Sequence, residues 1–203
     1  MKKFIAWALA LALLPAWLFV PVRATDFKDF TDREEIHYPD AVQVLNRLGI
    51  IIGYDDGSFR PELELSRGSA AKIIVSLLLG SDAARTMPNE VEPYPDVYNG
   101  YVFAGVIQYC KTSGLIDGYA DGTFQPKGVL TGFAFAKMLL GVLGYDNARE
   151  SFSGEGWTLN VTRAGHAAGL FEGFTFQGGE PINRETACQM VFNTLKASMV
   201  RYD

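Results

Sequence analysis

The sequence predicts an all-α fold of three helix-turn-helix repeats in a pseudo-threefold spindle or bundle, with short turns or hairpins as connectors. The stretch GYDDGSFRP at residues 53–61 returns as GYADGTFQP at residues 118–126. Apolar residues recur at the spacing of a helix face before and after each stretch. Two short helices bury little apolar surface alone, whereas stacked copies form a continuous core. We therefore expect the copies to close on one another.

The first two copies align without a gap, with residues 41–74 on residues 106–139. Residues identical in both include Gly49 and Gly114, Gly53 and Gly118, Tyr54 and Tyr119, Phe59 and Phe124, Pro61 and Pro126, Leu65 and Leu130, and Lys72 and Lys137. Such a register identifies one structural unit used more than once.

The third copy, residues 169–191, is degenerate but keeps the same repeat register. Gly169 and Gly173 have the spacing of the first two glycines in the other copies. The segment from Gly173 to Arg184 is three residues shorter than its counterparts. Phe176 keeps the aromatic position before the second helix, so the missing residues are those of the turn tip.

Each copy carries start and stop signals for two helices. In the first copy, Pro39-Asp40 suits a first helical turn and Gly49 suits a C-terminal cap. Ser66 is a good N-cap for the second helix, and Thr131 and Asn183 stand at the same place in the other copies. The apolar stripe of the first helix consists of Ala41, Val42, Leu45 and Leu48.

The N-terminus has the order of a secretory signal. Met1-Lys2-Lys3 precedes an apolar run at residues 4–20, and the small residue Ala24 precedes the first acidic residue. We expect cleavage after Ala24. An uncleaved signal anchor is the alternative, because the apolar run has about the minimum length for crossing a bilayer.

The predicted organisation is a signal peptide and three repeats. The signal occupies residues 1–24, and the repeats occupy residues 25–80, 92–146 and, in degenerate form, 151–203. The segments at residues 81–93 and 147–156 are polar and rich in Pro, Asn or Gly, so we interpret them as links.

Composition excludes some partners. The 203-residue chain has a net charge of −5, and without residues 1–24 it has 15 basic against 23 acidic residues. An acidic chain without basic runs argues against nucleic acid as a partner. No second long apolar run follows the signal, so we expect an exported protein with no membrane span after signal removal. Cys110 and Cys188 leave two alternatives open, a disulfide or two buried thiols.

Nothing in the sequence predicts catalysis. The two histidines, His37 and His166, fall near no serine or cysteine in a catalytic frame. No phosphate loop, paired-carboxylate pattern or zinc-protease motif is present. We therefore expect no enzyme, no catalytic residue, no cofactor and no metal.

The acidic turns resemble a calcium loop only at first sight. Counted from Asp55, the third, fifth and twelfth positions are Gly57, Phe59 and Ser66, which lack the carboxylate ligands that such a loop needs. Asp-Gly between apolar residues is instead a tight-turn signal, with Gly57 and Gly122 free to take a positive φ.

The ordered motifs resemble the S-layer homology domain. They are Phe30-Thr31-Asp32, Tyr38, Ala41-Val42, Gly49-Ile50-Ile51, GYDDGSFRP and Leu65 to Lys72, with Tyr94-Pro95-Asp96-Val97 opening the second copy. The resemblance implies a three-part helical spindle that anchors exported proteins to the wall of Gram-positive bacteria. It implies binding of peptidoglycan-linked secondary cell-wall polysaccharide, commonly pyruvylated.

The resemblance also implies a site. In many members the second helix opens with Thr-Arg-Ala-Glu, whose arginine reads the pyruvate carboxylate in a groove between repeats. The matching arginines here are Arg67 and Arg184, each following its N-cap, Ser66 or Asn183. The middle copy has Gly132 at this place, and we expect that copy to have lost its groove. Further candidates for glycan contact are the acceptors Asp32 and Asp96 and the rings of Tyr38 and Tyr101.

Elementary electrostatics favours the same arginines. At the first helical position, free backbone N–H groups and the helix dipole attract an anion, and a guanidinium adds a charge-assisted hydrogen bond. The alternatives are a solvated arginine or an ion pair for each position, and a core or capping role for Asp32, Asp96, Tyr38 and Tyr101. At the level of function, the alternative is a protein-interaction or surface-lattice module that binds other surface-layer proteins and has decayed glycan sites.

Overall fold

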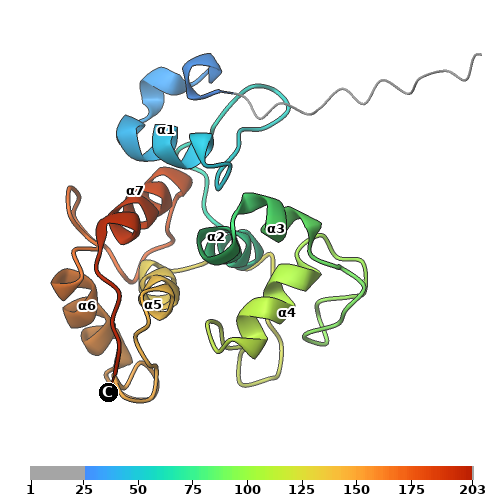
Figure 1. Cartoon of the computed structure of the whole chain (residues 1–203), viewed down its shortest axis with the longest axis vertical. Helices are drawn as coiled ribbons and strands as arrows, with labels where there is room; N and C mark the ends of the chain where they lie inside the picture. Colours follow the sequence, from blue (N-terminus) through green and yellow to red (C-terminus); the bar gives the residue numbers. More distant parts are fainter. Residues whose placement is uncertain (1–25, 203) are drawn as a thin grey trace, which may run out of the picture.

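The computed structural model describes residues 26–202 (Figure 1), so the predicted signal peptide lies outside the described residues. The elements in chain order are η1 Phe27–Asp29, η2 Arg33–Glu35, α1 Pro39–Arg47, α2 Arg67–Leu79, α3 Ser81–Thr86, α4 Ala104–Thr112, α5 Gly132–Val142, α6 Trp157–Ala167 and α7 Arg184–Lys196. Across residues 26–202 there is no strand, only three isolated β-bridges. The all-α prediction is confirmed.

The predicted helix signals work as expected. The side chains of Ser66, Thr131 and Asn183 each accept a hydrogen bond from the backbone N–H three residues later. The glycines that follow the first helix of each copy, Gly49 and Gly114 among them, take a positive φ near 70°. Local sequence therefore sets where these helices begin and end.

One local prediction is wrong, and one predicted link contains a helix. The segment expected to be a link contains a helix, α3, because Gly80 ends α2 with a φ of 90° and Ala84 packs into the core at 7% exposure. In α1, Leu48 lies outside the buried stripe at 50% exposure, whereas Ala41 and Leu45 are buried. Leu48 is the C-cap residue, where the chain turns away from the helix axis.

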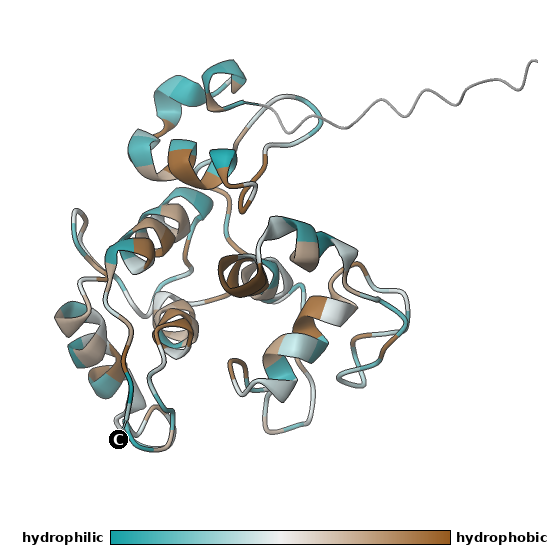
Figure 2. Ribbon diagram, viewed as in Figure 1, coloured by the Kyte–Doolittle hydropathy of each residue, from teal (hydrophilic) through white to brown (hydrophobic). Residues whose placement is uncertain are grey.

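The second helices of the three copies, α2, α5 and α7, form the inner layer, and the first helices lie outside them (Figure 1). Each first helix packs on the second helix of the preceding copy: α4 on α2, α6 on α5, and α1 on α7. Figure 2 shows apolar residues along the central helix α2 and polar residues on the outer surface of the first copy. Because the third copy also packs on the first, the contacts between copies form a closed cycle.

A cycle of backbone hydrogen bonds lies at the centre of this arrangement. Leu65 donates to Ile182 (2.8 Å), Ile182 to Leu130 (2.9 Å) and Leu130 to Leu65 (3.3 Å). All three side chains are buried. Each residue stands just before the N-cap of an inner helix, so the cycle fixes the three helix starts against one another. An exact threefold relation of the copies stays a prediction.

The GYDDGSFRP stretch and its repeat form tight turns. Gly57 and Gly122 both have a φ of +83°, as predicted. Within the first turn the Asp56 carboxylate accepts from Ser58 and Arg60, and these bonds hold its pKa well below its ordinary value. The acidic residue therefore shapes the turn.

Asp32 and Asp96 hold the ends of these turns. Asp96 accepts hydrogen bonds from the backbone N–H groups of Phe124 (2.8 Å) and Gln125 (2.6 Å), and Asp32 does the same one copy earlier. Gln125 has a φ of 56°, which a residue with a side chain adopts at a cost. The carboxylate therefore stabilises a strained backbone position.

Replacing Asp96 with alanine is expected to lower the free energy of unfolding by about 2 kcal/mol, because two charge-assisted hydrogen bonds are lost. Urea denaturation measures the change. The exposed Glu92→Ala is the matched control and should lie close to the wild type. Equal stability of both variants would show that Asp96 holds no strained turn.

Candidate functional site: three grooves between the copies

Three grooves of similar construction lie between the copies. We number each by the copy whose loop and second helix line it. Groove 1 (about 290 Å³) includes Gly53, Tyr54, Lys72, Phe103 and Arg184. Groove 2 (about 350 Å³) includes Gly118, Tyr119, Lys137, Trp157 and Arg67. Groove 3 (about 220 Å³) includes Phe174, Thr186, Met190, Tyr38 and Gly132. Each groove takes one residue from the preceding copy and one aromatic residue from the following copy.

Arg184 reaches from α7 into the loop of the first copy. Its Nε donates to the carbonyl of Phe59 (2.9 Å), and its Nη2 donates to the carbonyl of Ile52 (2.9 Å). The guanidinium lies over the rings of Tyr54 and Phe59, at 5.0 and 4.8 Å. The residue is 9% exposed, and burial lowers its pKa. Arg184 is thus a tie between copies as well as a groove residue.

Arg67 makes the matching contacts in groove 2. Its Nε donates to the carbonyl of Phe124 (2.7 Å) and its Nη2 to that of Asp117 (2.9 Å). These partners are in register with those of Arg184. Within residues 26–202, the Nη1 groups of Arg67 and Arg184 have no hydrogen-bond partner. Each arginine therefore keeps one amino group without a protein partner among the described residues.

In the structure, the groove without an arginine is groove 3 and not groove 2. Because each arginine reaches forward into the next copy, the loop of copy two receives Arg67, and groove 2 is complete. Gly132, at the arginine position of copy two, lines groove 3 instead. The expectation that the middle copy lost its groove is therefore wrong, since the missing arginine affects the third copy.

The first-turn N–H groups are not free. The backbone N–H groups of Arg67 and Gly68 donate to the carbonyls of Gly128 (3.1 Å) and Pro126 (2.9 Å). Those of α7 bind the connector of the first copy in the same way. The next N–H is taken by the N-cap side chain, so Ser66 and Asn183 are caps. The expectation of an anion held by free N–H groups is wrong, because the neighbouring copy occupies them.

The lysines of grooves 1 and 2 were not recognised as site residues from the sequence. Lys72 and Lys137 stand at matching positions of α2 and α5, five residues after the arginine position. Lys137 pairs with Asp117 at 2.8 Å. In groove 1 the residue in register with Asp117 is Ile52, and Lys72 has no acidic partner among the described residues. Burial, with Arg85 and Arg184 nearby, lowers the pKa of Lys72.

The groove aromatics also differ from the prediction. Tyr38 precedes α1, Phe103 precedes α4 and Trp157 begins α6, so each groove receives one ring from the start of a first helix. Tyr38 is thus placed in a groove. Tyr101 is 8% exposed, makes an edge contact with Phe103, and lines none of the three grooves.

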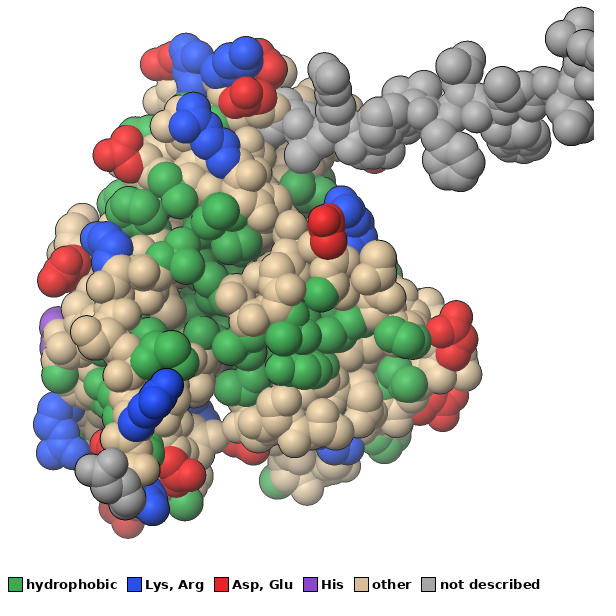
Figure 3. Space-filling model, in the orientation of Figure 1, with side chains coloured by type: hydrophobic (Ala, Val, Ile, Leu, Met, Phe, Trp, Pro, Cys, Tyr) green, Lys and Arg blue, Asp and Glu red, His purple; other side chains and the backbone are tan. Residues whose placement is uncertain are grey.

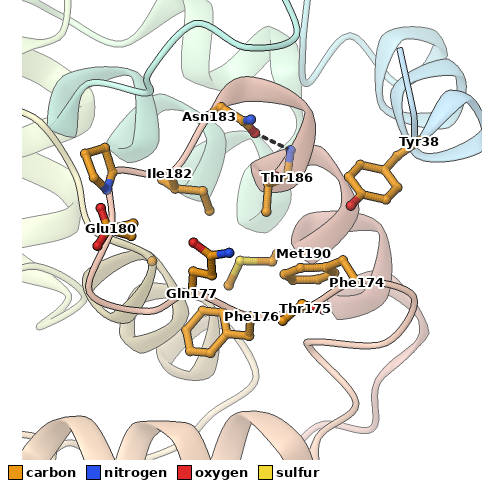
Figure 4. A pocket seen from close by; sticks show the side chains of 12 residues that line it. Tyr38, Phe174, Thr175, Phe176, Gln177, Glu180, Ile182, Asn183, Thr186 and Met190 are labelled. Atoms are coloured by element: carbon orange, nitrogen blue, oxygen red, sulfur yellow. Dashed lines mark hydrogen bonds between the residues drawn. The ribbon is translucent and has the colours of Figure 1, made fainter. Parts of the chain in front are cut away.

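Asp32 and Asp96 lie outside the linings of the grooves, and their oxygens bind the connector backbone. Figure 4 shows groove 3, where Tyr38 makes an edge contact with Phe174 and Met190 lies beside Phe174. Asn183 caps α7 through Thr186. No lysine or arginine lines groove 3, whereas Glu180 does. Grooves 1 and 2 each combine an arginine and a lysine with one aspartate, Asp55 or Asp117, whereas groove 3 has no cationic side chain.

Comparison with known proteins agrees with the repeat register. The model of the S-layer homology domain matches residues 29–71 and 93–136, the first and second copies. The third copy lies outside these matches.

Three curated relatives are similar over different shares of the chain. Cell surface glycoprotein 1 of Acetivibrio thermocellus is 38% identical over 50% of this chain and 4% of its own length. The cellulosome-anchoring protein of the same organism is 36% identical over 41% of this chain and 19% of its own. A cell surface protein of Thermoanaerobacter kivui is 25% identical over the whole chain and 26% of its own length. The chain thus matches about a quarter or less of each relative.

Proposed function

The chain belongs to the S-layer homology family, and from this premise we propose that it anchors at the bacterial cell wall by binding secondary cell-wall polysaccharide in grooves 1 and 2. The family and its surface-protein relatives indicate an exported structural protein of the cell surface and not an enzyme. No helix within residues 26–202 combines the length and apolarity needed to cross a membrane. The proposed ligand is the wall glycan, through an acidic, pyruvylated sugar unit.

The observation that best supports this proposal is the environment of Lys72. It is a half-buried cation with no acidic partner in the described part of the chain, and it lines groove 1 together with Arg184. A buried charge without a counter-charge is costly unless a ligand supplies one. A carboxylate between the Lys72 ammonium and the free Nη1 of Arg184 would satisfy both.

The rest of the groove suits a sugar ring. Phe103 in groove 1 and Trp157 in groove 2 offer half-buried aromatic faces beside the cations. A pyruvyl ketal presents a carboxylate on a ring with an apolar face, so one unit can satisfy the cation and the aromatic together. Two such grooves on one polymer also gain by avidity.

Sedimentation with purified wall fragments tests the proposal. The protein should sediment with peptidoglycan that carries its polysaccharide and stay in solution after mild-acid or enzymatic removal of pyruvate. Peptidoglycan stripped of all polysaccharide is the second control. Equal sedimentation with all three preparations would overturn the proposal.

A surface-lattice or protein-interaction module is the second candidate. Leu48, Leu79 and Leu195, near the C-terminal ends of α1, α2 and α7, are 46–50% exposed. Figure 3 shows apolar side chains gathered near the centre of one face. This candidate predicts concentration-dependent self-association or capture of another surface protein with no requirement for pyruvate.

A further inference from the structure

Three side chains of metal-ligating type meet where the third copy packs on the first. His37 precedes α1, Glu62 belongs to the first connector, and Glu185 is the second residue of α7. Their ligand atoms all lie within 4.8 Å of one another. No other such set of three occurs within residues 26–202.

Glu185 is the fixed member of this group. Its side chain is 3% exposed, and its two oxygens accept from the backbone N–H of His37 (2.7 Å) and contact the ring Nδ1 of His37 (2.9 Å). The His37 side chain is 72% exposed, and Glu62 is exposed and accepts from Asn183 at 2.8 Å. Rotation of the two exposed side chains can therefore bring all three ligand atoms to one ion without disturbing the core.

The other two junctions between copies show that this set is not a requirement of the fold. In register with His37, Glu62 and Glu185, the junction of copies one and two has Val102, Lys127 and Gly68. The junction of copies two and three has Trp157, Gly179 and Phe133, and there the two rings make contact, with centroids 6.2 Å apart. The junction of the third and first copies therefore has a potential metal ligand at all three positions, whereas the other two junctions have none at these positions.

We propose that His37, Glu62 and Glu185 bind a divalent transition-metal ion that joins the third copy to the first. One imidazole with two carboxylates is a ligand set that suits Zn²⁺ and similar ions, and water can complete the coordination. The ion would connect α7 to the start of α1 at the point where the cycle of copies closes. The site shares no residue with grooves 1 and 2, so metal binding can be tested independently of glycan binding.

Titration of the chelator-treated full protein with Zn²⁺ tests the proposal. Calorimetry should give saturable binding of one ion per chain, and Tm should rise by about 5–10 °C at a metal concentration roughly 100 times Kd. His37→Ala and Glu62→Gln change exposed side chains and should leave the fold intact. Each should weaken Zn²⁺ binding at least as much as loss of an outer-shell partner does, which is roughly 10–100-fold.

His166→Ala, which removes the other histidine, is the matched control and should bind Zn²⁺ as the wild type does. Unchanged affinity in both His37→Ala and Glu62→Gln would overturn the proposal. So would the absence of saturable binding to the wild type.

Discussion

Replacing Arg184 with alanine is expected to lower the free energy of unfolding by about 3 kcal/mol, because one buried and one partly buried carbonyl lose their donor. These carbonyls, of Phe59 and Ile52, belong to the first copy, whereas Arg184 belongs to the third. The guanidinium also leaves the rings of Tyr54 and Phe59. The tie between the third and first copies is thus lost, and urea denaturation measures the loss.

Two further variants separate this tie from other effects. Arg163→Ala removes an exposed arginine of α6 and should change stability little. Arg67→Ala should also destabilise, because it makes the same contacts between the first and second copies. If Arg184→Ala unfolded at the same urea concentration as Arg163→Ala, the carbonyl contacts would contribute nothing to the closure of the cycle.

Replacing Lys72 and Lys137 together with methionine should weaken binding to the wall polysaccharide by about 100-fold. Each lysine should contribute roughly 1.5 kcal/mol through a charge-assisted contact, which is about a tenfold effect. The effects multiply when two grooves hold one polymer. Sedimentation with wall fragments over a range of polysaccharide concentrations measures the change. Lys127→Met, which removes an exposed connector lysine, should bind as the wild type does.

The fold should survive this double replacement, which makes the lysines better probes of the site than the arginines. The pKa of Lys72 lies below its ordinary value of 10.5 because of burial and two nearby arginines. At a pH below the lowered pKa, the charged ammonium of Lys72 destabilises the folded state. Between the lowered pKa and 10.5 the unfolded chain binds more protons than the folded chain, so this destabilisation decreases as the pH rises. Lys72→Met should therefore unfold no earlier than the wild type at pH 7, with a gap that narrows at higher pH. Full binding by a stable double variant would contradict the assignment of the grooves.

The repeat register predicted much of the fold because its signals are local. Ser66 and Asn183 cap helices through N–H groups three residues away, and Gly57 has the positive φ that its turn requires. Such features depend on neighbouring residues, which a sequence displays directly. The helix α3 was not predicted because its residues are mostly polar and Ala84 is its one buried residue.

The site could be predicted only in part for the same reason. Alignment located Arg67 and Arg184, but the carbonyls that Arg184 binds are more than 120 residues away along the chain. Nothing local shows that an arginine of one copy enters the groove of the next. The importance of Lys72 likewise follows from the lack of an acidic partner in the folded groove, where Ile52 replaces Asp117.

Because Arg67 and Arg184 each enter the groove of the next copy, a complete groove needs more than one copy of the repeat. Groove 1 combines Arg184 of the third copy, the loop of the first copy and Phe103 of the second. Grooves 2 and 3 likewise draw on all three copies. Deleting any one copy would therefore remove part of every groove, whereas a circular permutation that keeps all three copies would leave every groove with its full set of residues.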